Sequence, residues 1–160
     1  MSKYAENTTV TSAASRDEIE RTLSRFGASQ FVYGWREEAA VIGFVAQGRQ
    51  VRFTLPLPDR NSPEITRTPE RGLARSREQQ EKAYEQAVRQ KWRALAVAIK
   101  AKFAAIEAGI SVFEREFFCD TVLPNGQTVG EYMLPQVEES YRSGEMPPML
   151  PMLGDGGENK

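Results

Sequence analysis

The sequence predicts an α+β fold: an N-terminal helix, a three-stranded antiparallel meander, a long helix packed on the sheet, and short C-terminal helices. Three observations support this prediction. Apolar residues recur at helical spacing before Gly27, three short segments with strand patterns lie between Gln30 and Pro56, and a longer helical pattern follows Ser76. The connections between the expected strands are short, so neighbouring strands must be antiparallel.

The chain of 160 residues is long enough for one domain with a real core, which we expect over residues 15–143. A flexible polar arm over residues 1–14 precedes it, and a Pro/Met/Gly-rich tail over residues 144–160 follows it. No apolar run approaches the roughly 18 residues that a membrane span needs, and the N-terminus lacks the apolar segment of a secretory signal. We therefore expect a cytoplasmic protein with no membrane partner.

The first helix is predicted over residues 16–26. Ser15 and Glu18 match the S/T-x-x-E capping box. Three apolar residues then share one helical face: Ile19, Leu23 and Phe26. Gly27 is a typical stop signal, so the pattern predicts about three turns with one apolar face turned inward.

Three strands are predicted next. In the first, three aromatic residues alternate onto one face: Phe31, Tyr33 and Trp35. The second, residues 39–46, is apolar on both faces, which predicts the central strand. After a turn at Gln47-Gly48, the third strand alternates apolar residues with polar ones: Val51, Phe53 and Leu55.

The segment over residues 56–76 is rich in arginine and proline and has no helical or strand period. Its four prolines are Pro56, Pro58, Pro63 and Pro69, and its arginines, with one just beyond, are Arg60, Arg67, Arg71, Arg75 and Arg77. A connection of this length without its own structure is either functional or disordered. Because arginine favours bidentate phosphate contacts, the segment is a candidate anion-binding loop.

The long helix is predicted from Ser76 or Arg77 to Glu107. Its core stripe is Trp92, Leu95, Ala96, Ile99, Phe103 and Ile106, with Arg89, Arg93 and Lys100 on one flank and Lys91 and Lys102 on the other. The side opposite the core is small and apolar: Ala94, Val97, Ala98, Ala101 and Ala104. Such a surface allows close helix approach, by the C-terminal helices or by another subunit. We favour the C-terminal helices, because Phe113, Phe117, Phe118 and Leu134 need to be buried.

Two further capping boxes predict the C-terminal helices. Ser111 and Glu114 open a short helix, and Thr128 and Glu131 open the last one, after a turn at Asn125-Gly126. The apolar residues of the last helix are Tyr132, Leu134, Val137 and Tyr141.

No catalytic motif is present. The chain has no histidine and one cysteine, which excludes Ser-His-Asp and Cys-His triads and His-containing zinc sites. Acidic groups at Glu37-Glu38 and at Glu114, Glu116 and Asp120 are better explained as solvated surface than as acid/base or metal sites. Cys119 follows two phenylalanines, so we expect a buried small hydrophobe. The sequence predicts no enzyme, no cofactor and no metal.

Charge is unevenly distributed along the chain, although the total is -1. The part from Arg36 to Lys102 has a net charge of +6, and the part from Phe103 to Lys160 has a net charge of -7. Two explanations are open: a basic surface for an anionic partner, or pairing of the two parts within the fold.

The order helix, three-stranded meander, long helix, over about residues 15–108, resembles two nucleic-acid-binding folds. One is the double-stranded RNA-binding domain; its lysine cluster is replaced here by the mixed charges of SREQQEKAYEQ. The other is the β-β-β-α core of the Rad52-type single-strand annealing proteins that many phages carry, and the chain resembles phage or mobile-element proteins in general style. The annealing-protein resemblance implies basic loops that bind nucleic acid.

The first functional expectation is therefore a non-enzymatic, phage-type nucleic-acid-binding protein, for single-strand binding or annealing. The residues expected to bind nucleic acid are Arg52, Arg60, Arg67, Arg71, Arg75, Arg77, Arg89 and Arg93. Strand aromatics beside Arg36, Arg49 and Arg52 would stack bases, unless they form the core beneath the helices.

The alternative is an accessory module of a phage that binds a protein or sequesters a small anion and acts on a host system. The alanine-rich helix face and the Met/Pro-rich tail suit docking to a host or phage protein, or to a second copy of the chain.

Overall fold

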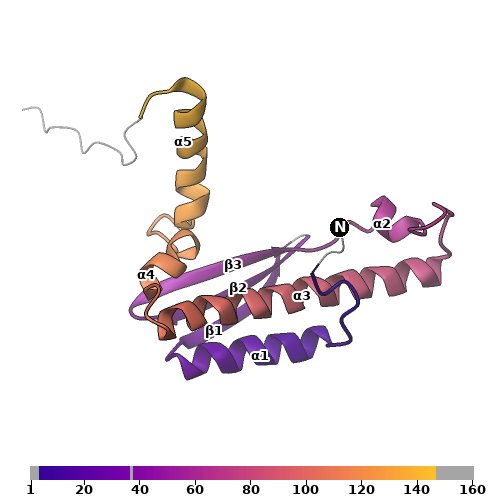
Figure 1. Ribbon diagram of the computed structural model, residues 1–160, viewed down its shortest axis with the longest axis horizontal. Helices are drawn as coiled ribbons and strands as arrows, with labels where there is room; N and C mark the ends of the chain where they lie inside the picture. Colours follow the sequence, from indigo (N-terminus) through magenta and orange to yellow (C-terminus); the bar gives the residue numbers. More distant parts are fainter. Residues whose placement is uncertain (1–3, 37, 147–160) are drawn as a thin grey trace, which may run out of the picture.

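The computed structural model describes residues 4–36 and 38–146 and confirms the α+β fold. Two helices, α1 (Ser12–Arg25) and α3 (Arg77–Glu107), lie side by side along the sheet (Figure 1). The strands are β1 (Ser29–Arg36), β2 (Ala39–Ala46) and β3 (Arg49–Pro56). The predicted tail beyond residue 146 lies outside the described residues.

The sheet has the order β1-β2-β3 with antiparallel neighbours, so β2 is central as predicted. Its inner face carries the buried residues Ala40, Ile42, Phe44, Ala46, Val51, Phe53 and Leu55. The β1–β2 register shifts between Ser29 and Val32, and Gln30 has a φ of 54° there. The shift is therefore a bulge near the start of the edge strand.

The core lies between this inner face and the two long helices. From α3 it takes Trp92, Ala96, Ile99 and Phe103, all buried and all on the predicted stripe. The ring of Trp92 lies 5.6 Å from that of Tyr33 on β1, and the rings of Phe103 and Phe117 are 5.2 Å apart. The C-terminal segment thus contributes Phe117 to the same core.

Helix α1 begins one turn earlier than its expected capping box, so that prediction is wrong. Thr11 is the N-cap, and its hydroxyl accepts a hydrogen bond from the Ala14 N–H at 3.1 Å. Ser15 is instead a fully buried residue within the helix. Thr11 and Ser15 could each cap the helix. Because Ser15 is buried with Ile19 in the helix interior, Thr11 becomes the N-cap.

The Arg/Pro-rich segment is not structureless. It contains a one-turn helix, α2 (Pro63–Thr66), whose Ile65 is buried, and a bridge joins Arg67 to Ala74. The Thr68 N–H donates to the carbonyl of Leu73 at 2.8 Å. One apolar side chain and a small turn therefore order the connection against the start of α3.

The C-terminal part consists of α4 (Phe113–Glu116), the 3-10 turn η1 (Phe118–Asp120) and α5 (Val129–Ser143). The capping box expected at Ser111 does not form, because Val112 occupies the N-cap position of this single turn without a side-chain bond. The box at Thr128 forms as predicted. Cys119 is exposed, so the expectation that it is buried is wrong; the turn places Phe117 inward and its neighbours outward.

Candidate interaction surfaces

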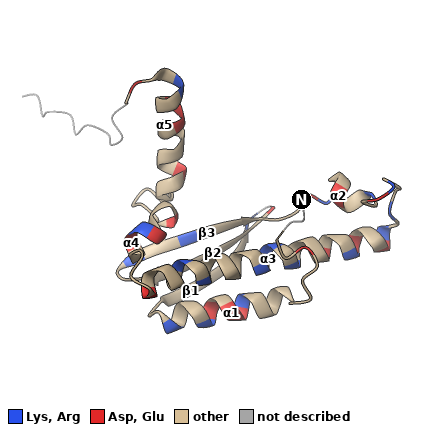
Figure 2. Cartoon of the chain, in the orientation of Figure 1, with Lys and Arg blue, Asp and Glu red and all other residues tan. Residues whose placement is uncertain are grey.

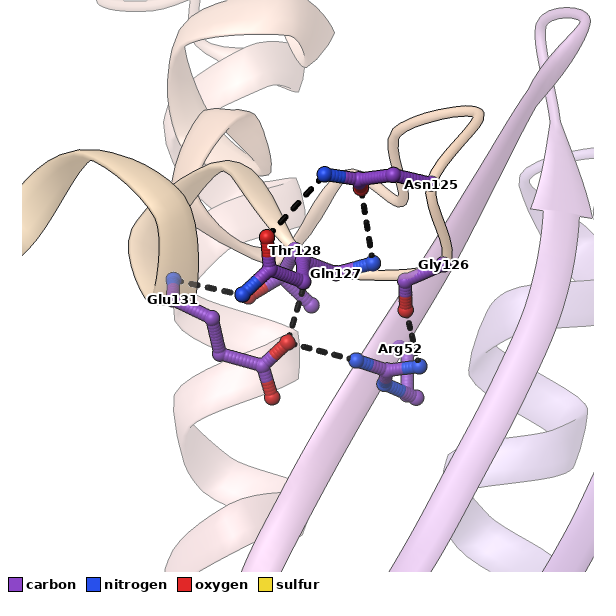
Figure 3. A network of polar contacts seen from close by, with 6 residues as sticks. All are labelled: Arg52, Asn125, Gly126, Gln127, Thr128 and Glu131. Atoms are coloured by element: carbon purple, nitrogen blue, oxygen red, sulfur yellow. Dashed lines mark hydrogen bonds and ion pairs between the residues drawn. The ribbon is translucent and has the colours of Figure 1, made fainter.

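The first turn of α5 is fixed to the sheet by a polar network (Figure 3). Arg52 on β3 donates to the carboxylate of Glu131 at 2.7 Å and to the carbonyl of Gly126 at 2.8 Å. The Thr128 hydroxyl accepts from the Glu131 N–H, and the Glu131 carboxylate accepts from the Thr128 N–H. That backbone bond, more than the nearby guanidinium, holds the pKa of Glu131 below its usual value.

Backbone contacts fix the same turn from the other side. The Val129 N–H donates to the carbonyl of Thr121 at 2.8 Å, and Thr121 is bridged to Val51 on β3. Gly130 lies so close to η1 that a Cβ atom built on it would be 3.0 Å from the carbonyl oxygen of Cys119. Opposed constraints of this kind leave the direction of α5 little freedom.

Beyond that turn, α5 stands away from the sheet and from the α1–α3 layer (Figure 1). Its packing neighbour is η1. The helix presents an apolar stripe at i, i+1, i+4 and i+8, here called the α5 stripe: Met133, Leu134, Val137 and Tyr141. Leu134 is 62 % exposed and Tyr141 is 89 % exposed. No apolar surface within the described ranges therefore covers this amphipathic helix.

The alanine face of α3 is also uncovered. Ala98, Ala101 and Ala104 are exposed, so our preference for the C-terminal helices as their cover was wrong. Phe113 and Phe117 are buried near the end of α3, whereas Phe118 and Leu134 are exposed. The reason is the anchored first turn, which directs α5 away from α3.

A third uncovered surface is the face of the sheet turned away from α1 and α3, here called the outer sheet face. Pairing across the strands places Val32 beside Gly43 and Gly34 beside Val41, with Val45 at the end of β2. Val32 is 64 % exposed. An antiparallel sheet with one face in water normally alternates apolar with polar residues, but β2 alternates apolar with apolar. Its sequence is that of a strand covered on both faces.

The two apolar surfaces differ in charge. The three strands contain no acidic residue and carry Arg36, Arg49 and Arg52. In contrast, the side of α5 beside and behind its stripe carries Glu131, Glu138 and Glu139 against the single Arg142 (Figure 2). The ion pair between Arg52 of β3 and Glu131 of α5 shows this difference: the sheet contributes the positive charge and the helix the negative one.

The arginines expected to bind nucleic acid are dispersed, and most of them have partners within the fold. Arg60 donates to both oxygens of Glu81, at 2.6 and 3.2 Å, and its guanidinium lies 3.7 Å from the ring centroid of Tyr84. Arg67 and Arg75 donate to backbone carbonyls of their own loop, at Gly72 and at Glu64. These three side chains brace the loop.

Two others of the set lie along α3. Arg89 donates twice to the side-chain oxygen of Gln86. Arg93 binds Glu18 of α1, as does Lys100. The hydrogen bond from Lys100, followed by that from Arg93, lowers the pKa of Glu18, although burial opposes the shift. Glu18, Arg93 and Lys100 therefore join α1 to α3, and both cations come from the flank of the long helix on which they were predicted to lie together.

Arg71 and Arg77 complete the set. Neither makes a hydrogen bond or ion pair with the described residues, and both are exposed. The positive charge of Arg77 contributes to the lowered pKa of Glu81. They are therefore the two predicted residues whose guanidinium groups point to solvent without an internal bond.

The strand aromatics do not form a base-stacking platform. Phe31 and Tyr33 pack against the core on the inner face. Trp35, at the end of the strand, is 59 % exposed and meets Tyr33 edge-on at 5.5 Å. The outer sheet face carries valine and glycine on β1 and β2 and Gln50, Arg52 and Thr54 on β3, so it offers no aromatic surface to a base.

Among the described residues, no three carboxylate or cysteine side chains gather as a metal site. None of the helices in the described ranges is long and apolar enough to span a bilayer. No protein-family model matches the chain, and no curated protein or solved structure is significantly similar to it. The resemblance to annealing proteins thus stays one of element order, and the surfaces themselves must carry any functional argument.

Proposed function

We propose that this protein is a non-enzymatic interaction module that binds a protein partner through the outer sheet face. The observation that carries the proposal is β2, whose outward residues are as apolar as its buried ones. These β2 residues are partly exposed and adjoin the exposed Val32 of β1, and apolar surface that is contiguous rather than scattered marks an interaction site.

The chemistry of the face defines the partner. On β1 and β2 the surface is apolar and shallow, with Val32, Val41 and Val45 beside Gly34 and Gly43, and on β3 it carries Gln50, Arg52 and Thr54. A Cβ atom added at Gly34 would have no neighbour within 4 Å. The strands at the border carry Arg36 and Arg52 and no acid, and Glu38 lies in the turn after Arg36. The partner that fits is an amphipathic helix with aliphatic or aromatic knobs and acidic residues beside them.

Site-specific photo-cross-linking tests the proposal in the cells that express the full chain. Val32 is replaced by p-benzoylphenylalanine, and a matched chain carries the same group at Glu20, which is exposed on α1. We expect a protein adduct from position 32 that is absent from position 20. Equal or absent labelling at the two positions would contradict an interaction role for the outer sheet face.

Nucleic-acid binding is the second candidate function. The observation that favours it is the braced loop, which holds Arg71 and Arg77 in solvent at one end of the molecule. Phosphate contacts by these two residues would weaken with salt, with log affinity falling by about 0.7 to 0.9 per unit of log salt for each phosphate neutralised. Titration of labelled single-stranded and duplex DNA and RNA over a range of salt concentrations measures that slope.

A further inference from the structure

The outer sheet face and the α5 stripe are complementary halves of one missing contact. Within residues 4–36 and 38–146, no helix covers the face and no apolar surface covers the helix. We propose that the occupant of the outer sheet face is α5 of a second copy of this chain, and that the two copies exchange their α5 helices reciprocally. This inference rests on the proposed function, because it names the partner for the same surface.

The dimensions of the two surfaces agree. Helix α5 has 15 residues, which at a rise of about 1.5 Å per residue gives about 22 Å. The strands have eight residues each, and at about 3.3 Å per residue they extend over about 26 Å. Three strands about 4.8 Å apart present a width close to one helix diameter. A single α5 helix is therefore enough to cover the face.

The shapes of the two surfaces also agree. The β1–β2 part of the face is lowest at Gly34 and Gly43, which lie on neighbouring strands, with valines beside them and Arg52 of β3 opposite Gly43. The α5 stripe offers large side chains, of which Leu134 and Tyr141 are the most exposed. Large knobs over a glycine depression give close helix–sheet contact and leave few voids.

Charge favours this pairing over a contact between two α5 helices. Glu138, beside the stripe, would approach the same residue of the other copy if the helices paired with each other, whereas Glu139 is already bonded to Arg142. On the outer sheet face Glu138 approaches strands that carry arginine and no acid; Arg36 there makes no ion pair with the described residues, and Glu38 lies in the turn that follows it. Opposite charges at an interface favour the correct partner and disfavour like-charged alternatives.

The helix of the same copy cannot make this contact. Its first turn is held by Arg52, by the Thr128 cap and by the close approach of Gly130 to Cys119. To lie on its own sheet, α5 would have to turn back at this anchored point. A second copy needs no such change, and two-fold symmetry applies the same contact twice. The repetition matters, because a stable interface buries roughly 1,200 Å² or more.

The test is the mass in solution of the full chain and of three single variants, by size-exclusion chromatography with light scattering. We expect wild type at twice the 18.0 kDa of one chain. Leu134→Glu on the stripe and Val32→Glu on the face should each reduce the mass by half. Ala101→Glu, an equally exposed site on the alanine face of α3, should remain dimeric.

Mixing identifies which surfaces meet. Leu134→Glu keeps an intact outer sheet face and Val32→Glu keeps an intact α5 stripe. One of the two contacts can therefore form in an equimolar mixture, which should associate more strongly than either variant alone and more weakly than wild type. If Leu134→Glu does not fold by circular dichroism, Tyr141→Glu replaces it at a site that is 89 % exposed.

Four outcomes would overturn the inference. These are a monomeric wild type, a dimer lost in only one of the stripe and face variants, a mixture that associates no more strongly than either variant alone, or a dimer abolished by Ala101→Glu. If wild type is a monomer and position 32 still cross-links to another protein, the occupant is not a second copy of this chain, and the proposed function stands.

Discussion

Arg52 on β3 and Glu131 in the first turn of α5 are 79 positions apart in sequence and are joined by an ion pair of 2.7 Å. This pair links the basic and the acidic parts of the chain. The other predicted arginines that form ion pairs do so with Glu18 and Glu81 instead. The basic and acidic parts of the chain thus pair at the base of α5; farther along the helix Glu139 is bonded to Arg142, and Glu138 is exposed.

The cap that cooperates with this pair gives the first prediction. Thr128→Ala removes the acceptor of the Glu131 N–H and should lower the free energy of unfolding by about 1 kcal/mol. Amide hydrogen exchange should accelerate in the first turn of α5 and not in α3. Uniform acceleration over both helices would show that the cap supports the whole fold rather than the base of α5.

Gly130 gives the second prediction. Gly130→Ala places a methyl group 3.0 Å from the Cys119 carbonyl oxygen, which is backbone and cannot rotate away. We expect a loss of about 1–3 kcal/mol of stability, typical of an overpacked site. Gly34→Ala, whose new methyl group meets nothing within 4 Å, is the control. Chemical denaturation of both variants in the Leu134→Glu background removes any contribution from association. Equal midpoints would contradict the close approach.

The elements of this fold are predictable from the sequence because each has a local cause. The stripe from Trp92 to Phe103, the alternation in β3 and the cap at Thr128 depend on neighbours in the chain, and the structure confirms all three. The capping box at Ser15 fails because that residue is buried within the helix, and the box at Ser111 fails because Val112 is the N-cap and the Ser111 hydroxyl makes no hydrogen bond with the described residues. Local cap signals are weak where the core competes for the same residue.

The candidate surfaces were harder to predict, because they depend on which faces the other elements leave uncovered in the fold. That β2 is apolar on both faces was visible in the sequence and correctly placed it in the centre. The same pattern also predicts cover on both faces, which a single copy does not supply. The partners of Arg60 and Arg93 could not be predicted, because spacing along the chain does not show which acid lies opposite.

Asp120 gives the third prediction. Burial, only partly offset by the charge of Lys102, raises the pKa of its carboxyl group. The folded state therefore favours the protonated form, so this contribution to stability is present in acid and is lost as the pH rises through the folded pKa. Asp120→Asn should melt at a higher temperature than wild type at pH 7, with the difference shrinking as the pH falls towards 4. A variant that is less stable at pH 7 would contradict this assignment.

Glu18 gives the fourth prediction, with the opposite sign. Its pKa is lowered chiefly by the hydrogen bond from Lys100, so its contribution is present above the ordinary carboxyl pKa and is lost as the pH falls through the folded value. Glu18→Gln should cost about 1 kcal/mol at pH 7, the upper end for a partly exposed ion pair. Chemical denaturation of wild type and variant at pH 7 and at pH 3 measures this cost and its dependence on pH. An equal cost at both pH values would exclude the charge of Glu18 as its origin.

The last prediction separates the two roles of the Arg/Pro-rich segment. Arg60, Arg67 and Arg75 are bonded within the fold, whereas Arg71 and Arg77 are not bonded to any described residue. Changing the first three to serine should release the loop, because the contacts to Glu81 and to the backbone carbonyls are lost. The Thr68 amide should then exchange faster and the loop should become sensitive to protease, while the core keeps its melting temperature, since Ile65 is the buried residue of this segment.

The matched double variant, Arg71→Ser with Arg77→Ser, should leave exchange and proteolysis of the loop unchanged. If the loop binds phosphate, this variant alone should reduce the salt slope of nucleic-acid binding by about 0.7 to 0.9 for each lost contact. A slope that is unchanged in the double variant but reduced in the triple one would mean that the braced arginines leave Glu81 and the carbonyls to bind phosphate. Absence of salt-sensitive binding by the wild type at micromolar protein would leave all five arginines with a structural or solubilising role, because bonds made within the fold already account for three of them.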